Sequence, residues 1–439
     1  SPRPTRMEFP DAGAVDAALP EVRFPTFARV SYDPETPVID DVRAAARDAV
    51  GSLSFSAVPA GGTVAVGLGS RGITDVRPIA EAVVAAVSAA GYDPVVVPAM
   101  GSHGGATAEG QRRTLAALGV TEEALGCPID ARMDAEVVGT TDRGHAVPVA
   151  TAALDADGIV VVNRVKPHTN FTGRIESGLS KMLTVGLGKR AGARAFHEAA
   201  ATHGYVDTIE RALGVVRANA PVVGGVAIVE NFHDRTAAVE GVPATALPDA
   251  ETDLLDRARE WLPTLPVEDL DALVVEAIGK DVSGSGMDTN VIGRYGVLNA
   301  ADPETPDVDR IAVLGLTDAT HGNGHGIGLA DVTTADVAAE LDLGEMYTNA
   351  LTSGSLSRSA VPVVLPSDRH ALRAAVATAG RYDPADARIA WLRDTAHLSS
   401  FRVSEALVDA VAGLDAVTVE RRERLAFDDG AAGFEPADG

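Results

Sequence analysis

The stretch VAVGLGSRGITDVRPIAEAVVAAVSAAGYDPVVVPAM, residues 64–100, contains the parts of a parallel α/β unit in order. The apolar run at 64–69 predicts a buried strand, and Pro78 opens an apolar segment of helical periodicity that ends at Gly91. A second apolar run follows at 94–100. A strand, a loop, a helix and another strand in this order predict two neighbouring parallel strands joined by a crossover helix.

The rest of the chain repeats this alternation. Apolar runs predict further strands at 158–163, 224–230, 272–278, 311–316 and 361–365. We therefore expect an α/β protein with two domains, mostly parallel sheets, and the active site in the cleft between the domains. The two prolines in residues 262–268 indicate a linker. The first predicted domain is therefore 1–265, which carries the catalytic residues, and the second is 266–427, which closes the cleft. Residues 428–439 are predicted to be a disordered tail.

Composition narrows the class of protein. The chain has 439 residues and is 46% hydrophobic, so it can bury sizeable cores. Its net charge of −25 disfavours binding to nucleic acid or to anionic membranes. Cys127 is the single cysteine, which excludes an internal disulfide, and no apolar run approaches membrane length. We expect a cytoplasmic protein, and its acidic, lysine-poor composition indicates either a halophile-like proteome or GC-rich codon usage.

Lysine is rare in this chain and concentrated in one stretch. Three of the four lysines, Lys166, Lys181 and Lys189, lie within RVKPHTNFTGRIESGLSKMLTVGLGK, residues 164–189, and the fourth is Lys280. Arginine can replace lysine where only a surface charge is needed, but not where an amine must react or be modified covalently. Lys181 and Lys280 are therefore candidates for chemistry specific to an amine, whereas Lys189, at a glycine-rich helix end, is expected to satisfy terminal carbonyls.

Cationic and titratable side chains follow several of the predicted strands. Arg71, His103, the pair Lys166 and His168, and Lys280 each lie just past the carboxyl end of a strand. Ligands of open α/β sheets bind at that edge, so these residues predict a site for an anionic ligand, unless they only reflect the usual polarity of loops.

Glycine-rich loops surround some of these residues. His103 lies in GSHGGAT, residues 101–107, and an exposed imidazole there suits proton transfer. Lys280 opens KDVSGSGMD, in which Ser283, Gly284 and their free backbone N–H groups predict a nest for phosphate or carboxylate. HGNGHGIG, residues 321–328, either lines the cleft or forms a flexible turn. From the residues alone, the histidines at 103, 168 and 197 form either a metal site or an acid/base set.

These motifs together resemble the nickel-dependent lactate racemase family, whose members also racemise or epimerise other 2-hydroxy acids. The resemblance rests on GSHGGAT around His103 and on KPH…SGLSKML…H from Lys166 to His197, and it extends to GKDVSGSGMD and HGIGLADVTT. It implies a racemase or epimerase that inverts the C2 stereocentre of a 2-hydroxy acid by reversible hydride transfer. The hydride acceptor would be a lysine-tethered nickel-pincer nucleotide (pyridinium-3,5-bisthiocarboxylic acid mononucleotide nickel complex), and the intermediate a 2-keto acid.

The resemblance also implies a role for each matching residue. Lys181 would be the covalent tether, His197 the nickel ligand, and His103 and His168 the acid/base pair. Arg71 and Lys280 would hold the substrate carboxylate or a cofactor phosphate, and Lys280, Ser283 and Gly284 would contact the cofactor. Enzymes of cofactor biosynthesis would be partners, together with a small-molecule 2-hydroxy acid.

Some residues depart from the family pattern. The spacer from His168 to Lys181 is longer than in lactate racemase and carries Arg174 and Glu176, and the acid that commonly precedes the loop arginine is missing. These differences leave the substrate open, and the sequence does not give the oligomeric state. Two alternatives stand beside the racemase: an NAD(P)-dependent dehydrogenase of a small hydroxy acid, based on the G-x-G-x-x-G pattern at 67–72, and a non-catalytic protein that binds an anionic ligand.

Overall fold

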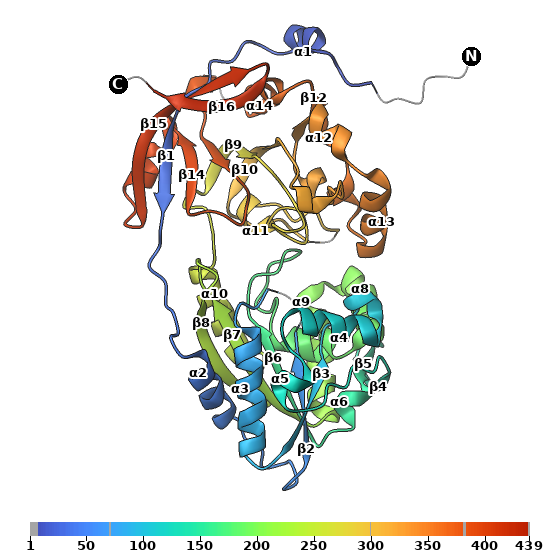
Figure 1. The fold of residues 1–439 in the computed structure, drawn as a ribbon. Coiled ribbons are helices and arrows are strands. Elements are labelled where there is room, and N and C mark those ends of the chain that lie inside the picture. The colour runs from blue at the N-terminus through green and yellow to red at the C-terminus, as the bar shows by residue number, and fades with distance from the viewer. Residues whose placement is uncertain (1–7, 70–71, 299, 381–382, 438–439) are drawn as a thin grey trace, which may run out of the picture. The chain divides into compact units, whose positions relative to one another are not determined.

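The computed structural model describes residues 8–69, 72–298, 300–380 and 383–437 (Figure 1). The chain divides into two compact units. We call Thr36–His168 with Thr172–Leu262 the central unit, and Ser1–Glu35, Thr169–Phe171 and Pro263–Gly439 the terminal unit. The main division, after Leu262, lies close to the predicted boundary at 265. It differs from the prediction because the first 35 residues belong with the C-terminal part of the chain.

The central unit contains a five-stranded sheet in the order β3-β2-β6-β7-β8. Its first four strands are parallel and β8 is antiparallel to β7. The bounds are β2 Thr63–Leu68, β3 Asp93–Pro98, β6 Gly158–Arg164, β7 Val222–Glu230 and β8 Thr236–Pro243. All four parallel strands were predicted from apolar runs, because a parallel strand buried on both faces is almost continuously apolar. The predicted α/β class with mostly parallel sheets is confirmed.

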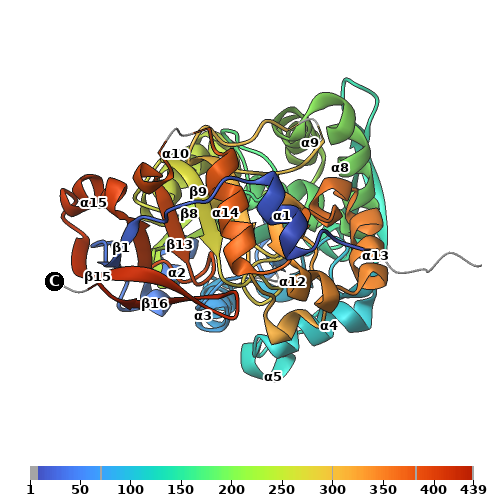
Figure 2. The ribbon, with the colours of Figure 1, turned by 90° about the horizontal axis from the view of Figure 1, so that it is seen from above.

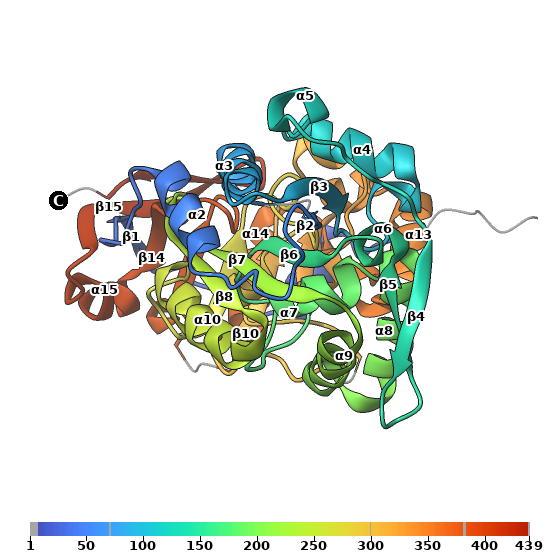
Figure 3. The same cartoon turned by 90° about the horizontal axis from the view of Figure 1, so that it is seen from below.

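Helices cover both faces of this sheet, as Figure 3 shows for α3 on one side and α9 and α10 on the other. Alternate residues of β2 separate the two cores: Val64 and Val66 pack with α2 and α3, whereas Ala65 faces the core built with α9 and α10. The helices are α2 Val42–Gly51, α3 Val76–Ala89, α4 Ala108–Ala117, α5 Glu122–Leu125, α6 Thr151–Leu154, α7 Leu179–Lys181, α8 Lys189–His203, α9 Tyr205–Asn219 and α10 Asp249–Trp261.

A separate two-stranded hairpin completes the central unit. Strands β4 (Ala135–Thr140) and β5 (Ala146–Ala150) pair antiparallel with each other. The hairpin packs on α8 and α9 (Figure 3). Its buried residues, Val147 and Val149 among them, join the core on the α9 side of the main sheet.

The terminal unit is built on a nine-stranded mixed sheet in the order β12-β11-β10-β9-β13-β14-β1-β15-β16. Strands from β12 to β13 are parallel and those from β14 to β16 are antiparallel to their neighbours. The bounds are β1 Thr26–Tyr32, β9 Asp269–Val275, β10 Asp307–Val313, β11 Val332–Thr334, β12 Val363–Leu365, β13 Ile389–Leu392, β14 Ser400–Ser404, β15 Val417–Asp428 and β16 Ala431–Pro436.

Strand β1 explains why the first residues belong to this unit, since it lies between β14 and β15. Figure 2 shows α1 beside α14, where Arg373 donates to Asp16 and to the carbonyl of Pro20. The helices of the unit are α1 Ala12–Ala18, α11 Thr289–Ile292, α12 Ala335–Glu340, α13 Leu343–Ser353, α14 Asp368–Thr378 and α15 Glu405–Ala412. No helix in the described ranges is both long and apolar enough to cross a membrane.

The prediction of a disordered tail at 428–439 is wrong for its described part. Strand β16 pairs antiparallel with β15 and ends at Pro436. The ring centroid of Phe434 lies 4.8 Å from that of Trp391 and 5.4 Å from that of Phe27. The acidic composition of the tail concealed this strand, because one aromatic anchor and backbone pairing with β15 are enough to order it.

Candidate active site

The loops at the carboxyl ends of β3 and β6 carry the catalytic candidates of the central unit. His103 lies between β3 and α4, and Lys166 and His168 follow β6. Since β3, β2 and β6 are parallel neighbours, these loops leave the same edge of the sheet. Arg71, in the loop after β2, lies outside the described residues. Lys280 follows a strand of the other sheet, so the predicted cationic strand ends do not all belong to one sheet edge.

Lys181 and His168 are in direct contact. The Lys181 amine is hydrogen-bonded to Nε2 of His168. Lys181 ends α7 and is followed at once by a π-helical turn, Met182–Gly186, a form of helix that occurs often at functional sites. Burial of the amine, with the nearby positive charge of Lys166, lowers the pKa of Lys181 to about 8, although Glu176 acts in the opposite direction. The amine is therefore far easier to deprotonate than that of an exposed lysine.

Glu176 fixes the loop that carries His168. Its side chain is buried, and its Oε2 accepts a hydrogen bond from the backbone N–H of His168. Its Oε1 accepts from the backbone N–H of Gly173 at 2.9 Å and from Arg259 at 2.7 Å. Burial raises the pKa of Glu176 above its usual value, against the effect of these donors. This residue of the long spacer is thus a support for His168.

His197 lies on the exposed side of α8, within electrostatic reach of the tether candidate. Partial burial of its ring, followed by the positive charge of Lys181, lowers the pKa of His197. A neutral imidazole is the form that binds a metal ion. Of the predicted residues, His168 contacts Lys181, and the pKa of His197 responds to the charge of Lys181.

His103 is exposed at the start of a short 3-10 turn, Gly104–Ala106. The turn requires glycine: Gly104 has φ +66°, and a Cβ on it would come within 2.5 Å of the backbone of Gly110 in α4. The backbone N–H of His103 donates to the carbonyl of Met100 at 3.0 Å. The loop therefore lies tightly against α4 while it leaves the imidazole accessible.

Lys189 and Gln111 brace the His103 loop from inside the protein. Lys189 is fully buried, and its amine donates to the carbonyl of Pro98 at 2.7 Å and to Oε1 of Gln111 at 3.0 Å. Gln111 in turn donates to the carbonyls of Gly101 at 2.9 Å and His103 at 3.4 Å. The expectation that Lys189 satisfies carbonyls at the end of a helix is wrong, because Lys189 begins α8 and bonds the end of β3. In the sequence, only the scarcity of lysine in this chain pointed to a special role for Lys189.

The other predicted ligand-binding residues lie in the terminal unit. Lys280 donates to the carbonyl of Gly284 at 2.9 Å, and the hydroxyls of Ser283 and Ser285 are 3.1 Å apart, so the loop is a compact turn held by its own contacts. His325 is buried, and burial, Lys280 and Arg358 lower its pKa to about 4. The glycine-rich segment 321–328 therefore contributes a buried neutral histidine beside two cations.

Arg358 was missed by sequence reasoning and has a structural link to the His168 loop. Within the terminal unit, Arg358 donates to the carbonyl of Thr169 at 2.6 Å, and the hydroxyl of Thr289 donates to the same carbonyl at 3.0 Å. Thr169 follows His168 directly in the chain. One arginine among 33 had no distinguishing mark in the sequence.

The glycine pattern at 67–72 does not have the context of a dinucleotide fingerprint. Such a pattern should run straight into a helix, whereas α3 begins only at Val76. A Cβ on Gly69 would meet Oδ1 of Asn163 at 2.4 Å, so this glycine allows β2 and β6 to pack closely. Within the described part of the chain, no group of three or more His, Cys, Asp or Glu side chains is arranged to hold a metal ion.

Comparisons with known proteins concern the first half of the chain and its fold. Residues 15–207 match the family model described as the lactate racemase N-terminal domain, a span of just under half of the chain that contains the Lys181 group and His103. By this match, the part of the chain that carries His103, His168, Lys181 and His197 is similar to the N-terminal domain of lactate racemases.

Most of the chain has a counterpart among solved structures. It is similar to the structure of the lactate racemase apoprotein from Thermoanaerobacterium thermosaccharolyticum, with a TM-score of 0.52 over 84% of this chain and 98% of that chain. The sequence identity is 11%, so this similarity concerns the fold. No curated protein matches the sequence significantly.

Proposed function

We propose that the chain is a racemase or epimerase that inverts the C2 stereocentre of a 2-hydroxy acid. The observation that carries the proposal is the contact between the Lys181 amine and His168, in a domain of the lactate racemase family. A buried amine with a lowered pKa beside an imidazole suits covalent attachment of a cofactor, whereas an exposed lysine would serve only as a charge.

The residues around Lys181 fit the nickel-pincer nucleotide of this family. The lowered pKa of Lys181 favours the unprotonated amine that an acyl linkage needs, and His197 offers a neutral imidazole as a nickel ligand near it. When bound, the cofactor would supply an electrophilic centre that accepts and returns hydride. Lys280, Ser283 and Gly284 remain the proposed cofactor contacts of the terminal unit, and Arg71 with Lys280 the proposed anchors for substrate carboxylate or phosphate.

The chain's own histidines would move the proton of the substrate hydroxyl. The C2–H bond of a 2-hydroxy acid is too weakly acidic for a simple base, so the bond breaks as hydride while the hydroxyl proton goes to a base. Nε2 of His168 is the atom that would take this proton, and acylation of Lys181 would remove the ammonium donor that now occupies it. His103 would serve the opposite enantiomer, so that the 2-keto acid receives hydride on either face.

Protein produced together with the cofactor-biosynthesis enzymes tests the proposal. Intact-mass and peptide analysis should show added mass on the Lys181 peptide, and chiral chromatography over a panel of 2-hydroxy acids should show racemisation of at least one. Lys181→Arg is the matched control, since it keeps the charge but cannot form the linkage. Unmodified Lys181 with no bound nickel would refute the cofactor assignment, and turnover unaffected by His168→Ala would refute the acid/base role.

A further inference from the structure

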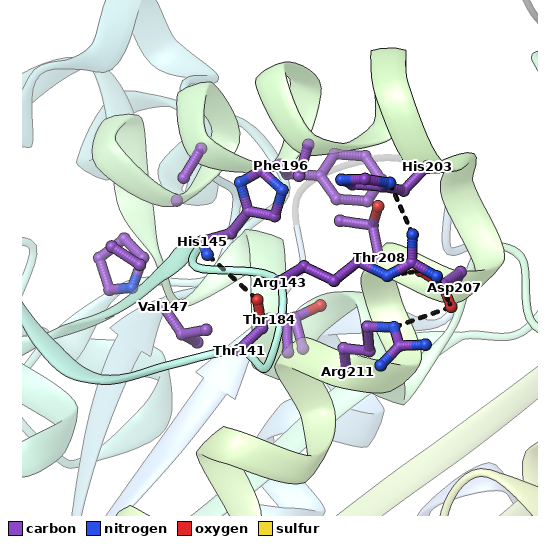
Figure 4. A pocket seen from close by; sticks show the side chains of 16 residues that line it. Thr141, Arg143, His145, Val147, Thr184, Phe196, His203, Asp207, Thr208 and Arg211 are labelled. Atoms are coloured by element: carbon purple, nitrogen blue, oxygen red, sulfur yellow. Dashed lines mark hydrogen bonds and ion pairs between the residues drawn. The ribbon is translucent and has the colours of Figure 1, made fainter.

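A pocket lies in the central unit, between the β4–β5 hairpin and helices α8 and α9 (Figure 4). Its lining combines apolar side chains, among them Val147, Phe196 and Ala199, with polar side chains such as His145 and His203. A mixed lining of this kind suits a small amphipathic molecule.

His145 lines this pocket and contains an unsatisfied polar atom. Its Nε2 is buried and has no hydrogen-bond partner among the residues that the structure describes. The backbone N–H of His145 donates to the hydroxyl of Thr141 at 3.1 Å, which fixes the residue at the hairpin turn. Its ring centroid lies 5.2 Å from that of His203, and Figure 4 shows both rings near Phe196. A buried ring nitrogen without a partner costs free energy that a bound ligand would recover.

The two arginines near the pocket are balanced by two carboxylates, so Arg143 offers hydrogen-bond donors to a ligand and not surplus charge. Arg211 donates to Asp207 at 2.8 Å and also pairs with Asp142, so it is matched by two carboxylates. Arg143 donates to Nδ1 of His203 at 2.7 Å, but its contacts with Asp207 are 3.4 Å, longer than ordinary charged hydrogen bonds. Arg143 therefore has one close partner, the Nδ1 atom of His203, and retains N–H groups for a further acceptor.

We propose that this pocket is a binding site for a small monocarboxylate with a short hydrocarbon chain. The carboxylate accepts hydrogen bonds from Arg143 and from Nε2 of His145, and the hydrocarbon chain packs on Val147, Phe196 and Ala199. These lining residues are distinct from His103, His168, Lys181 and His197, and the inference does not depend on the proposed racemase activity.

Isothermal titration calorimetry of the purified chain with sodium butyrate tests this site. Butyrate has the carboxylate and the tail but no 2-hydroxyl group, so it cannot be racemised. We expect one butyrate bound per chain, with at least tenfold weaker binding in His145→Leu, which removes a hydrogen-bond donor to a charged group. Arg143→Gln should weaken binding similarly, and it decides the question if His145→Leu does not fold. Butylamine, with the same tail and opposite charge, should not bind.

Two further variants locate the binding. His168→Ala, at the proposed active site, and His397→Leu, an exposed histidine of the terminal unit, should bind butyrate as the wild-type chain does. If butyrate binding is lost in His168→Ala but kept in His145→Leu and Arg143→Gln, butyrate binds at the active site and the proposal is overturned. The absence of butyrate binding to the wild-type chain would also overturn it. Racemase assays are not used, so failure of the proposed function leaves this test intact.

Discussion

The buried amine of Lys189 makes a prediction about stability that can be worked out from the structure. Burial lowers the pKa of Lys189 from 10.5 to about 8, against the effect of Asp130. A shift of this size corresponds to about 3 kcal/mol, at roughly 1.4 kcal/mol per pH unit. The amine also donates to Pro98 and Gln111, and each acceptor left unpaired in the interior costs about 1–3 kcal/mol.

The sign of the pH effect follows from the direction of the shift. Between about pH 8 and 10.5 the unfolded chain keeps the Lys189 proton that the folded chain has lost, so the free energy of unfolding rises with pH in this window. The penalty for burying the ammonium is fully present below pH 8. Lys189→Met removes the titrating group and keeps most of its volume. The wild-type chain should therefore gain up to about 3 kcal/mol over Lys189→Met between pH 7.5 and 10.

Urea unfolding followed by hydrogen-exchange mass spectrometry measures this difference for the central unit, because its peptides report separately from those of the terminal unit. Lys181 titrates in both proteins and cancels in the comparison. Lys189→Arg is the matched control: a guanidinium keeps its proton throughout this range, so it should show no gain. A difference between wild type and Lys189→Met that stays flat or shrinks with pH would show that the amine is not buried as described.

Other contacts lead to three further predictions. Glu176→Ala leaves the backbone N–H of His168 without its acceptor. We expect kcat of the loaded enzyme to fall at least tenfold and calorimetric stability to drop by about 1–3 kcal/mol. An unchanged kcat would show that Glu176 does not position His168. Glu251, whose pKa burial raises to about 7, should destabilise the central unit as pH rises from 4.5 to 7, and Glu251→Gln should abolish that slope in urea unfolding. Phe434→Ala should lower the free energy of unfolding of the terminal unit by about 2–3 kcal/mol, which is less than for a fully buried phenylalanine because Phe434 is half-buried. If denaturation shows no such loss, β16 does not stabilise the sheet edge.

Local patterns were sufficient for the framework of the fold. Continuous apolar runs identified the parallel strands β2, β3, β6 and β7, because burial on both faces leaves a one-dimensional signal in the chain. Ordered motifs also indicated the lactate racemase family. By contrast, β1 was not predicted, since its place between β14 and β15 depends on partners far along the chain.

The active-site residues show the same division between sequence and structure. Composition by itself singled out the four lysines, because a chain that uses arginine almost everywhere keeps lysine where an amine is needed. The sequence already separated Lys181 from Lys189, but only the tertiary structure showed their surroundings: Lys181 contacts His168, whereas Lys189 is buried against Pro98 and Gln111. The reason is physical: a residue type records which chemistry is possible, whereas burial and hydrogen-bond partners, which set pKa and orientation, come from segments brought together by folding.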